Sequence, residues 1–264
     1  MSPITRFSAF VALAAALVGT TSTAWGAPIA FDDFERAASN DLGTTPVGGY
    51  LWSETEQSVA DRIQLVNAPI SAADFNSRGS GSDPTAVINV GLTDVSVSAI
   101  MRSDLVASNN YFGGIRYRVP FPSAGFASDV SVASGGYTVE ITQALWDANR
   151  VANSVTLRWA NNVLLASVVY APTFVTDTDY ELRVDAIGDS HKVYVDGTLV
   201  IDFTETTAGR DIAGAAGMGT YYGNWLFDDF TVNAIPEPSS FVIALVVGML
   251  GGIGIGVRKS RRNS

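Results

Sequence analysis

The chain contains no cysteine, which excludes disulfides, thiolate nucleophiles and zinc–thiolate sites together. It contains a single histidine, His191, so no second imidazole is available for a histidine-rich transition-metal site. A Ser-His-Asp catalytic system would have to use this one residue, which lies between Ser190 and Lys192 where a hairpin is predicted to begin. We expect His191 to be a solvated turn residue.

Basic residues are scarce in the middle of the chain. Five of the 16 Lys and Arg residues but only one of the 26 Asp and Glu residues lie in 1–26 and 236–264, which leaves 11 basic and 25 acidic residues between these ends. So acidic a segment repels phosphate backbones and anionic lipid head groups, which argues against a nucleic-acid partner. It can, however, collect divalent cations.

The first 26 residues have the order of a secretory signal peptide. Arg6 precedes an apolar run over 7–18, and Ala24-Trp25-Gly26 places small residues at the −3 and −1 positions of a cleavage site after Gly26. Cleavage after Ala24 fits almost as well, and a retained membrane anchor is the alternative. We expect residues 1–26 to be removed on export.

The last 30 residues predict a membrane-spanning tail. An uncharged run over 241–257 follows Pro236-Glu237-Pro238. As a helix it would span about 25 Å, the short end of what crosses a bilayer. A basic cluster after the run would hold that end in the cytoplasm and leave the preceding domain outside. This cluster consists of Arg258, Lys259, Arg261 and Arg262.

These three parts, in this order, resemble the PEP-CTERM sorting signal of Gram-negative bacteria, and the resemblance covers residues 236–264. It implies recognition by an exosortase-type membrane peptidase and processing near the Pro-Glu-Pro motif. The precursor would be anchored in the inner membrane. The product would be delivered to the cell surface or extracellular matrix.

Between the two ends, short runs of period-two alternation are separated by Gly, Asn, Asp, Ser and Pro, which is typical of β-strands. Asp196-Gly197 predicts a tight hairpin turn with positive φ angles. We therefore expect residues 27–234 to form an all-β, two-sheet antiparallel jelly-roll sandwich. The predicted strands cover 29–34, 62–66, 86–90, 95–102, 111–119, 137–143, 154–160, 163–170, 180–187, 192–195, 198–203, 217–222 and 226–232.

Two stretches of this middle segment resemble laminin-G-like, concanavalin A-like jelly rolls of secreted bacterial proteins. Phe31-Asp32-Asp33-Phe34-Glu35-Arg36, with Leu42-Gly43 and Trp52 after it, is similar to the opening of such domains. Tyr180-Glu181-Leu182-Arg183-Val184, followed by Val193-Tyr194-Val195-Asp196-Gly197, resembles paired strands near their C-terminal end. The resemblance implies the fold and a tendency toward glycan binding, but a fold alone does not give a function.

Two Asp pairs form a candidate calcium site. Asp32-Asp33 lies near the start of the domain and Asp228-Asp229 near its end, each between two phenylalanines. If the end strands pair, up to four carboxylates converge, and calcium prefers six to eight oxygen ligands. Alternatively, one Asp of each pair faces water and the other caps a turn.

Exposed aromatic side chains could stack against sugar rings. Trp146, beside Asp147 in an irregular stretch, and Tyr221-Tyr222, near Asn224, are the best candidates. The alternative is that most aromatic residues fill the core, the usual position of Trp in a sandwich. The wider set of candidates is Trp52, Trp146, Trp159, Trp225, Tyr111, Tyr221 and Tyr222.

The sequence carries no recognised catalytic array. Glucanases of this fold place acids in an alternating Glu-x-Asp-x-Glu pattern, and this pattern is absent. Glu181 and Asp185 share a strand face, but we expect that face to lie in solvent. The favoured hypothesis is a non-enzymatic surface or matrix protein that binds or organises exopolysaccharide. The alternatives are a secreted glycoside hydrolase or lyase with an unrecognised site and a purely structural surface protein.

Overall fold

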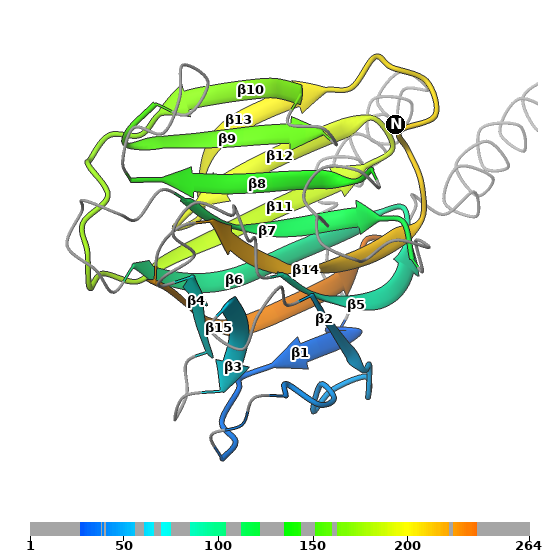
Figure 1. The fold of residues 1–264 in the computed structure, drawn as a ribbon. Coiled ribbons are helices and arrows are strands. Elements are labelled where there is room, and N and C mark those ends of the chain that lie inside the picture. The colour runs from blue at the N-terminus through cyan, green and yellow to red at the C-terminus, as the bar shows by residue number, and fades with distance from the viewer. Residues whose placement is uncertain are drawn as a thin grey trace, which may run out of the picture.

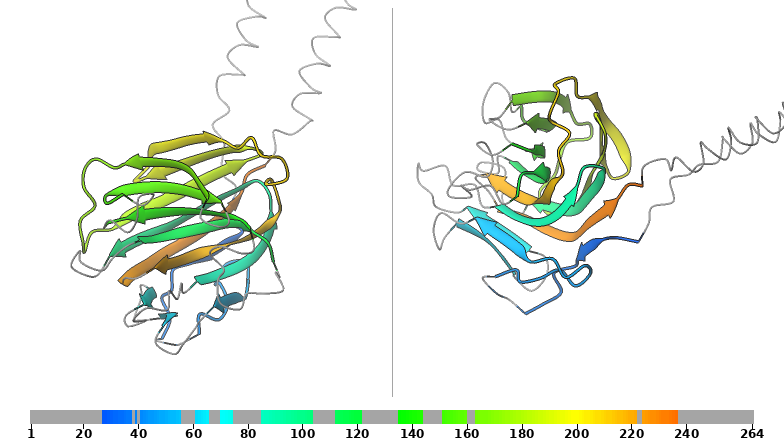
Figure 2. Two further views of the ribbon diagram at one scale, coloured as in Figure 1. Left: turned by 45° about the horizontal axis from the view of Figure 1, so that its top comes forward. Right: turned by 90° about the vertical axis from the view of Figure 1, so that its right-hand side faces the viewer.

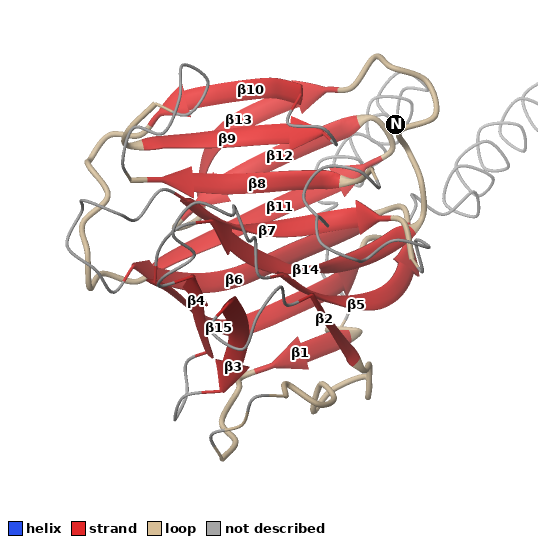
Figure 3. Ribbon diagram, viewed as in Figure 1, coloured by secondary structure: helices blue, strands red, loops and turns tan. Residues whose placement is uncertain are grey.

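The computed structural model describes residues 27–37, 39, 41–55, 61–65, 70–74, 85–103, 112–121, 135–143, 151–159, 163–221 and 224–236. The predicted signal peptide, Glu237, Pro238, the run 241–257 and the basic cluster lie outside them. The described residues form fifteen β-strands (Figure 3). Within these ranges, no helix has the length and apolar character needed to span a membrane.

The strands form two antiparallel sheets that pack face to face (Figures 1 and 2). The seven-stranded sheet has the order β10 (Val163–Val169), β9 (Ser154–Trp159), β8 (Tyr137–Thr142), β7 (Phe112–Val119), β14 (Gly214–Tyr221), β5 (Thr85–Leu92), β2 (Trp52–Thr55). The eight-stranded sheet has the order β13 (Thr198–Thr204), β12 (Ser190–Val195), β11 (Tyr180–Ile187), β6 (Val95–Ser103), β15 (Asn224–Ala234), β4 (Ile70–Asp74), β3 (Asp61–Leu65), and β1 (Ala30–Asp32) also pairs with β15.

The core lies between the two sheets and follows from the alternation. Along β11, for example, Tyr180, Leu182 and Val184 are buried, while the residues between them point away from the core. Trp225, Phe227 and Phe230 are the largest contributions from β15, and each such buried side chain contributes about 2–3 kcal/mol. The all-β, two-sheet jelly-roll prediction is confirmed.

Each of the thirteen predicted strands corresponds to an observed one, with ends shifted by a few residues. Strands β2 and β4 were not predicted. The predicted hairpin turn is confirmed between β12 and β13, where Asp196 and Gly197 have φ angles of 48° and 73°. These positive values match the right-handed twist of the flanking strands.

The first and last described strands of the domain lie side by side (Figure 1). Ala30 is opposite Val232, and Asp32 is opposite Phe230. The backbone N–H of Ile29 also donates to the carbonyl of Val232 at 2.9 Å. The condition on which the two Phe-Asp-Asp-Phe segments would come together, that the end strands pair, is therefore met.

Candidate functional site

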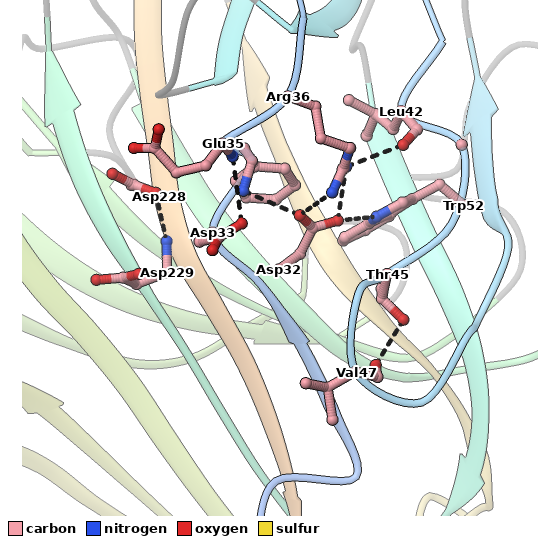
Figure 4. A network of polar contacts seen from close by, with 12 residues as sticks. Asp32, Asp33, Glu35, Arg36, Leu42, Thr45, Val47, Trp52, Asp228 and Asp229 are labelled. Carbon is pink, nitrogen blue, oxygen red and sulfur yellow. Dashed lines mark hydrogen bonds and ion pairs between the residues drawn. The ribbon is translucent and has the colours of Figure 1, made fainter.

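Asp32 lies in the core, where its carboxylate accepts four hydrogen bonds (Figure 4). Arg36 donates two of them, at 2.6 and 2.9 Å. The Trp52 indole donates the third, at 2.8 Å, and the backbone N–H of Phe34 donates the fourth, at 2.9 Å. This set of donors occupies both carboxylate oxygens, so Asp32 is removed from the proposed calcium ligands. It is instead a turn cap and a core anchor, which matches the alternative reading of the sequence.

Of the other three aspartates, Asp33 follows β1, and Asp228 and Asp229 lie on the neighbouring strand β15 (Figure 4). Asp229 is exposed, whereas Asp33 and Asp228 are half-buried. Burial raises the pKa of Asp228, and the nearby carboxylates of Asp229, Glu35 and Asp33 raise it further. Asp33 accepts from the backbone N–H of Glu35, and Asp228 accepts from that of Asp229. Within the described ranges, no three His, Asp or Glu side chains are grouped closely enough to hold a metal ion. Calcium binding by these residues stays a prediction.

His191 is fully buried between the sheets, so the expected solvated turn position is wrong. The residue belongs to β12, and its alternation with Val193 and Val195 places it on the core face. Its Nδ1 lies 2.8 Å from the Tyr117 hydroxyl, whereas its Nε2 has no hydrogen-bond partner. Burial lowers the pKa of His191 to about 4, with a further lowering by the Arg118 charge. The imidazole is therefore neutral near pH 7.

A second polar group borders His191. Tyr137 packs 4.4 Å from the imidazole between ring centroids, and its hydroxyl lies 3.4 Å from Glu205. Burial alone would raise the pKa of Glu205, but hydrogen bonds from Arg210 and Thr207 outweigh it and lower this pKa to about 2. Glu205 is therefore ionised near pH 7 and forms an ion pair with Arg210 at 2.8 Å. This arrangement orders the core rather than supplying a free acid or base.

Seven polar side chains share the outer face of the seven-stranded sheet, and we call them the polar face. Because Tyr137, Val139 and Ile141 of β8 point into the core, the intervening residues must point outward, and the same alternation holds on β7 and β9. Six of the seven are buried, although this face points away from the core. The polar face consists of Arg116 on β7, Thr138, Glu140 and Thr142 on β8, and Ser154, Thr156 and Arg158 on β9.

The centre of the polar face is held by Glu140. Its carboxylate accepts from the Arg158 guanidinium at 3.1 Å and from the Thr156 hydroxyl at 3.2 Å. By contrast, the Thr142 hydroxyl is buried without a hydrogen-bond partner. A buried hydroxyl without a partner is destabilising by roughly 1–3 kcal/mol. Thr142 therefore keeps an unused donor and acceptor, and its side chain is closed to solvent in this structure.

The polar face was not predicted, although its signal is present in the sequence. Thr138, Glu140 and Thr142 alternate along one strand, and Ser154, Thr156 and Arg158 alternate along the next. Together they give two adjacent strands an unbroken polar side.

The predicted aromatic platform is only partly within the described residues. Trp52 and Trp225 are buried, which confirms the alternative that tryptophans fill the core. Tyr221 is the last residue of β14, whereas Trp146 and Tyr222 lie outside the described residues. No contact therefore supports or contradicts these three as sugar-binding residues.

The acids singled out on β11 do not form a solvated pair. Both point away from the core, but Asp185 is only 9% exposed and accepts from the Ser96 hydroxyl at 2.8 Å. Burial raises the pKa of Asp185, and the Ser96 hydrogen bond opposes that effect. The expectation of full solvent exposure is thus wrong for Asp185.

Comparisons with known proteins place the fold. No protein-family model and no curated protein sequence matches the chain. Among solved structures, a galectin-like protein of unknown function from Bacillus subtilis has a TM-score of 0.57 at 8% identity, covering 80% of this chain and 97% of its own. Mannose-glycan-bound and calcium-bound VIP36 exoplasmic/lumenal domain has a TM-score of 0.54 at 12% identity, covering 71% and 88%. The carbohydrate-binding module CBM66 from Bacillus subtilis has a TM-score of 0.51 at 17% identity, covering 69% and 95%. The chain therefore has the galectin-like jelly-roll fold that these proteins share.

Proposed function

We propose that this chain is an exported, non-enzymatic protein that binds extracellular polysaccharide through the polar face. The observation that carries the proposal is the sheltered row of hydroxyl, guanidinium and carboxylate groups on β7, β8 and β9, with the Thr142 hydroxyl unused. Such groups form the hydrogen bonds that sugar hydroxyls require. The fold shared with a carbohydrate-binding module and the glycan-bound VIP36 domain supports the same conclusion.

The polar face favours binding over hydrolysis. Glycosidases use two carboxylates about 5–9.5 Å apart, one on each side of the scissile bond. On β7, β8 and β9 the outer face carries one carboxylate, Glu140, and this residue is paired with Arg158. The alternative of a hydrolase or lyase would need a second acid from another part of the chain.

Export and sorting form the second part of the proposal. The signal-like residues 1–26 and the Pro236-Glu237-Pro238 tail support delivery to the cell surface by an exosortase-type peptidase. Intact-mass measurement of the protein recovered from the envelope is expected to show loss of 1–26. A full-length chain in the cytosol would contradict export.

Glycan binding is tested with exopolysaccharide purified from the producing bacterium, in a pull-down and on a glycan array, with calcium present. Replacing Thr142 by valine removes the unused hydroxyl without changing shape. We expect Thr142→Val to weaken binding about 5-fold and to raise the free energy of unfolding by about 1 kcal/mol.

Thr156→Val is the matched control. It removes the same hydroxyl from the next strand, but that hydroxyl already donates to Glu140. We expect this variant to lower the free energy of unfolding by about 1 kcal/mol. Absence of any glycan binding by the wild-type chain would overturn the proposed function, and unchanged binding by Thr142→Val would remove the polar face as its site.

Calcium binding is a further part of the proposal. It is supported by the proximity of Asp33 and Glu35 to Asp228, whose pKa their charges raise. We expect about 1 mM calcium to raise the melting temperature by about 2 °C or more through binding to the folded state. Magnesium at equal ionic strength should not raise the melting temperature, because it requires a stricter ligand geometry than calcium, which takes more oxygen ligands in a more flexible arrangement. Asp228→Asn should abolish the difference. Equal shifts with both ions would show charge screening alone.

A further inference from the structure

The strand paths of the two sheets end in four edge strands, and one of these differs in charge from the other three. An edge strand exposes a row of unpaired backbone N–H and C=O groups, and charged residues normally prevent it from pairing with another chain. Glu54 lies on edge strand β2, Asp202 on β13, and Asp61 and Arg62 on β3. Strand β10 carries no charged residue.

The uncharged stretch of sequence is longer than the strand itself. Residues 159–176 contain no Asp, Glu, Lys or Arg, in a chain with 42 such residues. Within β10 three aliphatic side chains are well exposed: Val163 at 42%, Leu164 at 39% and Val169 at 64%. Within the described part of the chain, β10 pairs with β9 alone. One protective feature remains, a β-bulge between Leu164 and Ala166, and the ladder is regular from Ala166 to Val169.

The sequence of β10 is complementary to itself. In an antiparallel pair centred on Ala166, Val163 is opposite Val169 and Leu164 is opposite Val168. Aliphatic and β-branched cross-strand pairs of this kind stabilise a sheet by roughly 0.2–1 kcal/mol each. The net charge of −10 makes two copies repel one another over most of their surface, and the uncharged edge is where that repulsion is weakest.

We propose that the β10 edge binds the β10 edge of a second copy of this chain. The two strands pair antiparallel about a twofold axis perpendicular to the sheet, which makes the contact isologous and closed. The two seven-stranded sheets become one continuous sheet.

The pairing also places two polar faces on the same side of that sheet. Because β9, β8 and β7 follow β10 in order, each polar face lies beside the contact. A long polysaccharide could then engage both copies, and the second binding event would be intramolecular. This consequence rests on the proposed function, whereas the pairing itself does not.

Sedimentation velocity of the full chain at about 100 µM in a non-ionic detergent, with bound detergent subtracted, tests the pairing. We expect the wild type to sediment as a dimer, with twice the chain mass of 27.8 kDa. The double variant Leu164→Lys/Val169→Lys should sediment as a monomer. Leu51→Lys is the matched control, because Leu51 is 69% exposed but lies next to β2, at the opposite edge of the same sheet. It should remain dimeric, and far-UV circular dichroism should be the same for all three chains.

Two further measurements separate this edge from other contacts. Raising NaCl from about 20 to 500 mM should increase the dimer fraction, since salt screens the repulsion between copies and the edge has no ion pairs to weaken. Because the chain has no cysteine, Ser167→Cys offers a single thiol near the proposed axis, which a short bis-maleimide should cross-link. Thr44→Cys, an exposed site near β2, should not cross-link.

A monomeric wild type overturns the proposal, as does a double variant that remains dimeric or a Leu51→Lys variant that dissociates equally. If the double variant does not fold, cross-linking decides: equal yields from Ser167→Cys and Thr44→Cys overturn the pairing. Glycan binding by a monomer would leave the proposed function intact while removing the dimer.

Discussion

At the scale of single residues, the polar groups in the core determine how the protein responds to acid. His191 has one ring nitrogen beside the Tyr117 hydroxyl and another with no partner. A proton on this ring would place a charge where water cannot reach it. The pKa of about 4, below the usual 6.5, expresses that penalty.

The resulting pH dependence has a definite sign. As the pH falls below 6.5, the unfolded chain binds a proton at His191, while the folded chain does not until about pH 4. Acid therefore favours unfolding across this window, by roughly 3 kcal/mol in total. Urea unfolding between pH 7 and 5 measures it without interference from most carboxylates. His191→Gln should abolish the slope, and because the chain has no other histidine, a persisting slope would contradict the assignment.

The Asp32-Asp33 dipeptide gives two neighbouring carboxylates different roles. Asp32 accepts from Arg36, Trp52 and the backbone, whereas Asp33 accepts one hydrogen bond, from Glu35, near the surface. The alternation of β1 explains the difference, because successive side chains point to opposite faces.

Replacing each residue by alanine is expected to separate these roles. Asp32→Ala leaves a guanidinium and an indole N–H without their acceptor, so we expect a loss of about 3 kcal/mol in the free energy of unfolding. Asp33→Ala should change it by less than about 0.5 kcal/mol. Chemical denaturation of both variants is the measurement. Equal losses would show that the buried network is not what stabilises this end of the domain.

At the scale of elements, glycine has two separate purposes in this fold. Gly197 supplies a φ of 73° in the β12–β13 turn, and a Cβ there would have nothing within 4 Å. Gly217 lies in mid-strand β14, and a Cβ there would collide with the backbone carbonyl of Ala86 on β5. The first requirement is conformational and the second is steric.

Alanine substitutions should therefore differ in cost. We expect Gly197→Ala to lower the free energy of unfolding by about 1 kcal/mol, the usual penalty for a left-handed backbone at a non-glycine residue. Gly217→Ala should lower it by about 3 kcal/mol or more, because two paired strands would have to separate. Urea unfolding curves of both variants provide the comparison. A larger effect at Gly197 would contradict the close approach of β14 and β5.

At the scale of the whole molecule, the fold could be predicted because its signals are local. Period-two alternation identified strands such as β11, and Asp196-Gly197 identified the hairpin of β12 and β13. The pairing of β1 with β15 was anticipated from a repeated motif. Strand β4, Ile-Ser-Ala-Ala-Asp, was missed because small and polar residues dominate it.

The candidate site was harder to predict from the sequence, because it depends on contacts between residues far apart in the chain. His191 could not be placed from its neighbours, since a turn residue and a core-facing residue share the same local sequence context. The role of Asp32 as a buried hydrogen-bond acceptor depends in part on Trp52, which lies twenty positions away in the sequence. The polar face depends on three strands being adjacent, which alternation within each strand does not establish.

The pairing of β1 with β15 also has a mechanical consequence. Both ends of the domain leave from the same end of one antiparallel pair, where Ile29 is bonded to Val232. A tension applied across the two ends would therefore load these bonds one after another, as when a zip is opened, instead of sharing the load among them. Tension applied at only one end of the domain would not load the hydrogen bonds between β1 and β15. The domain is thus better suited to hang from a single tether than to act as a link in a stretched chain.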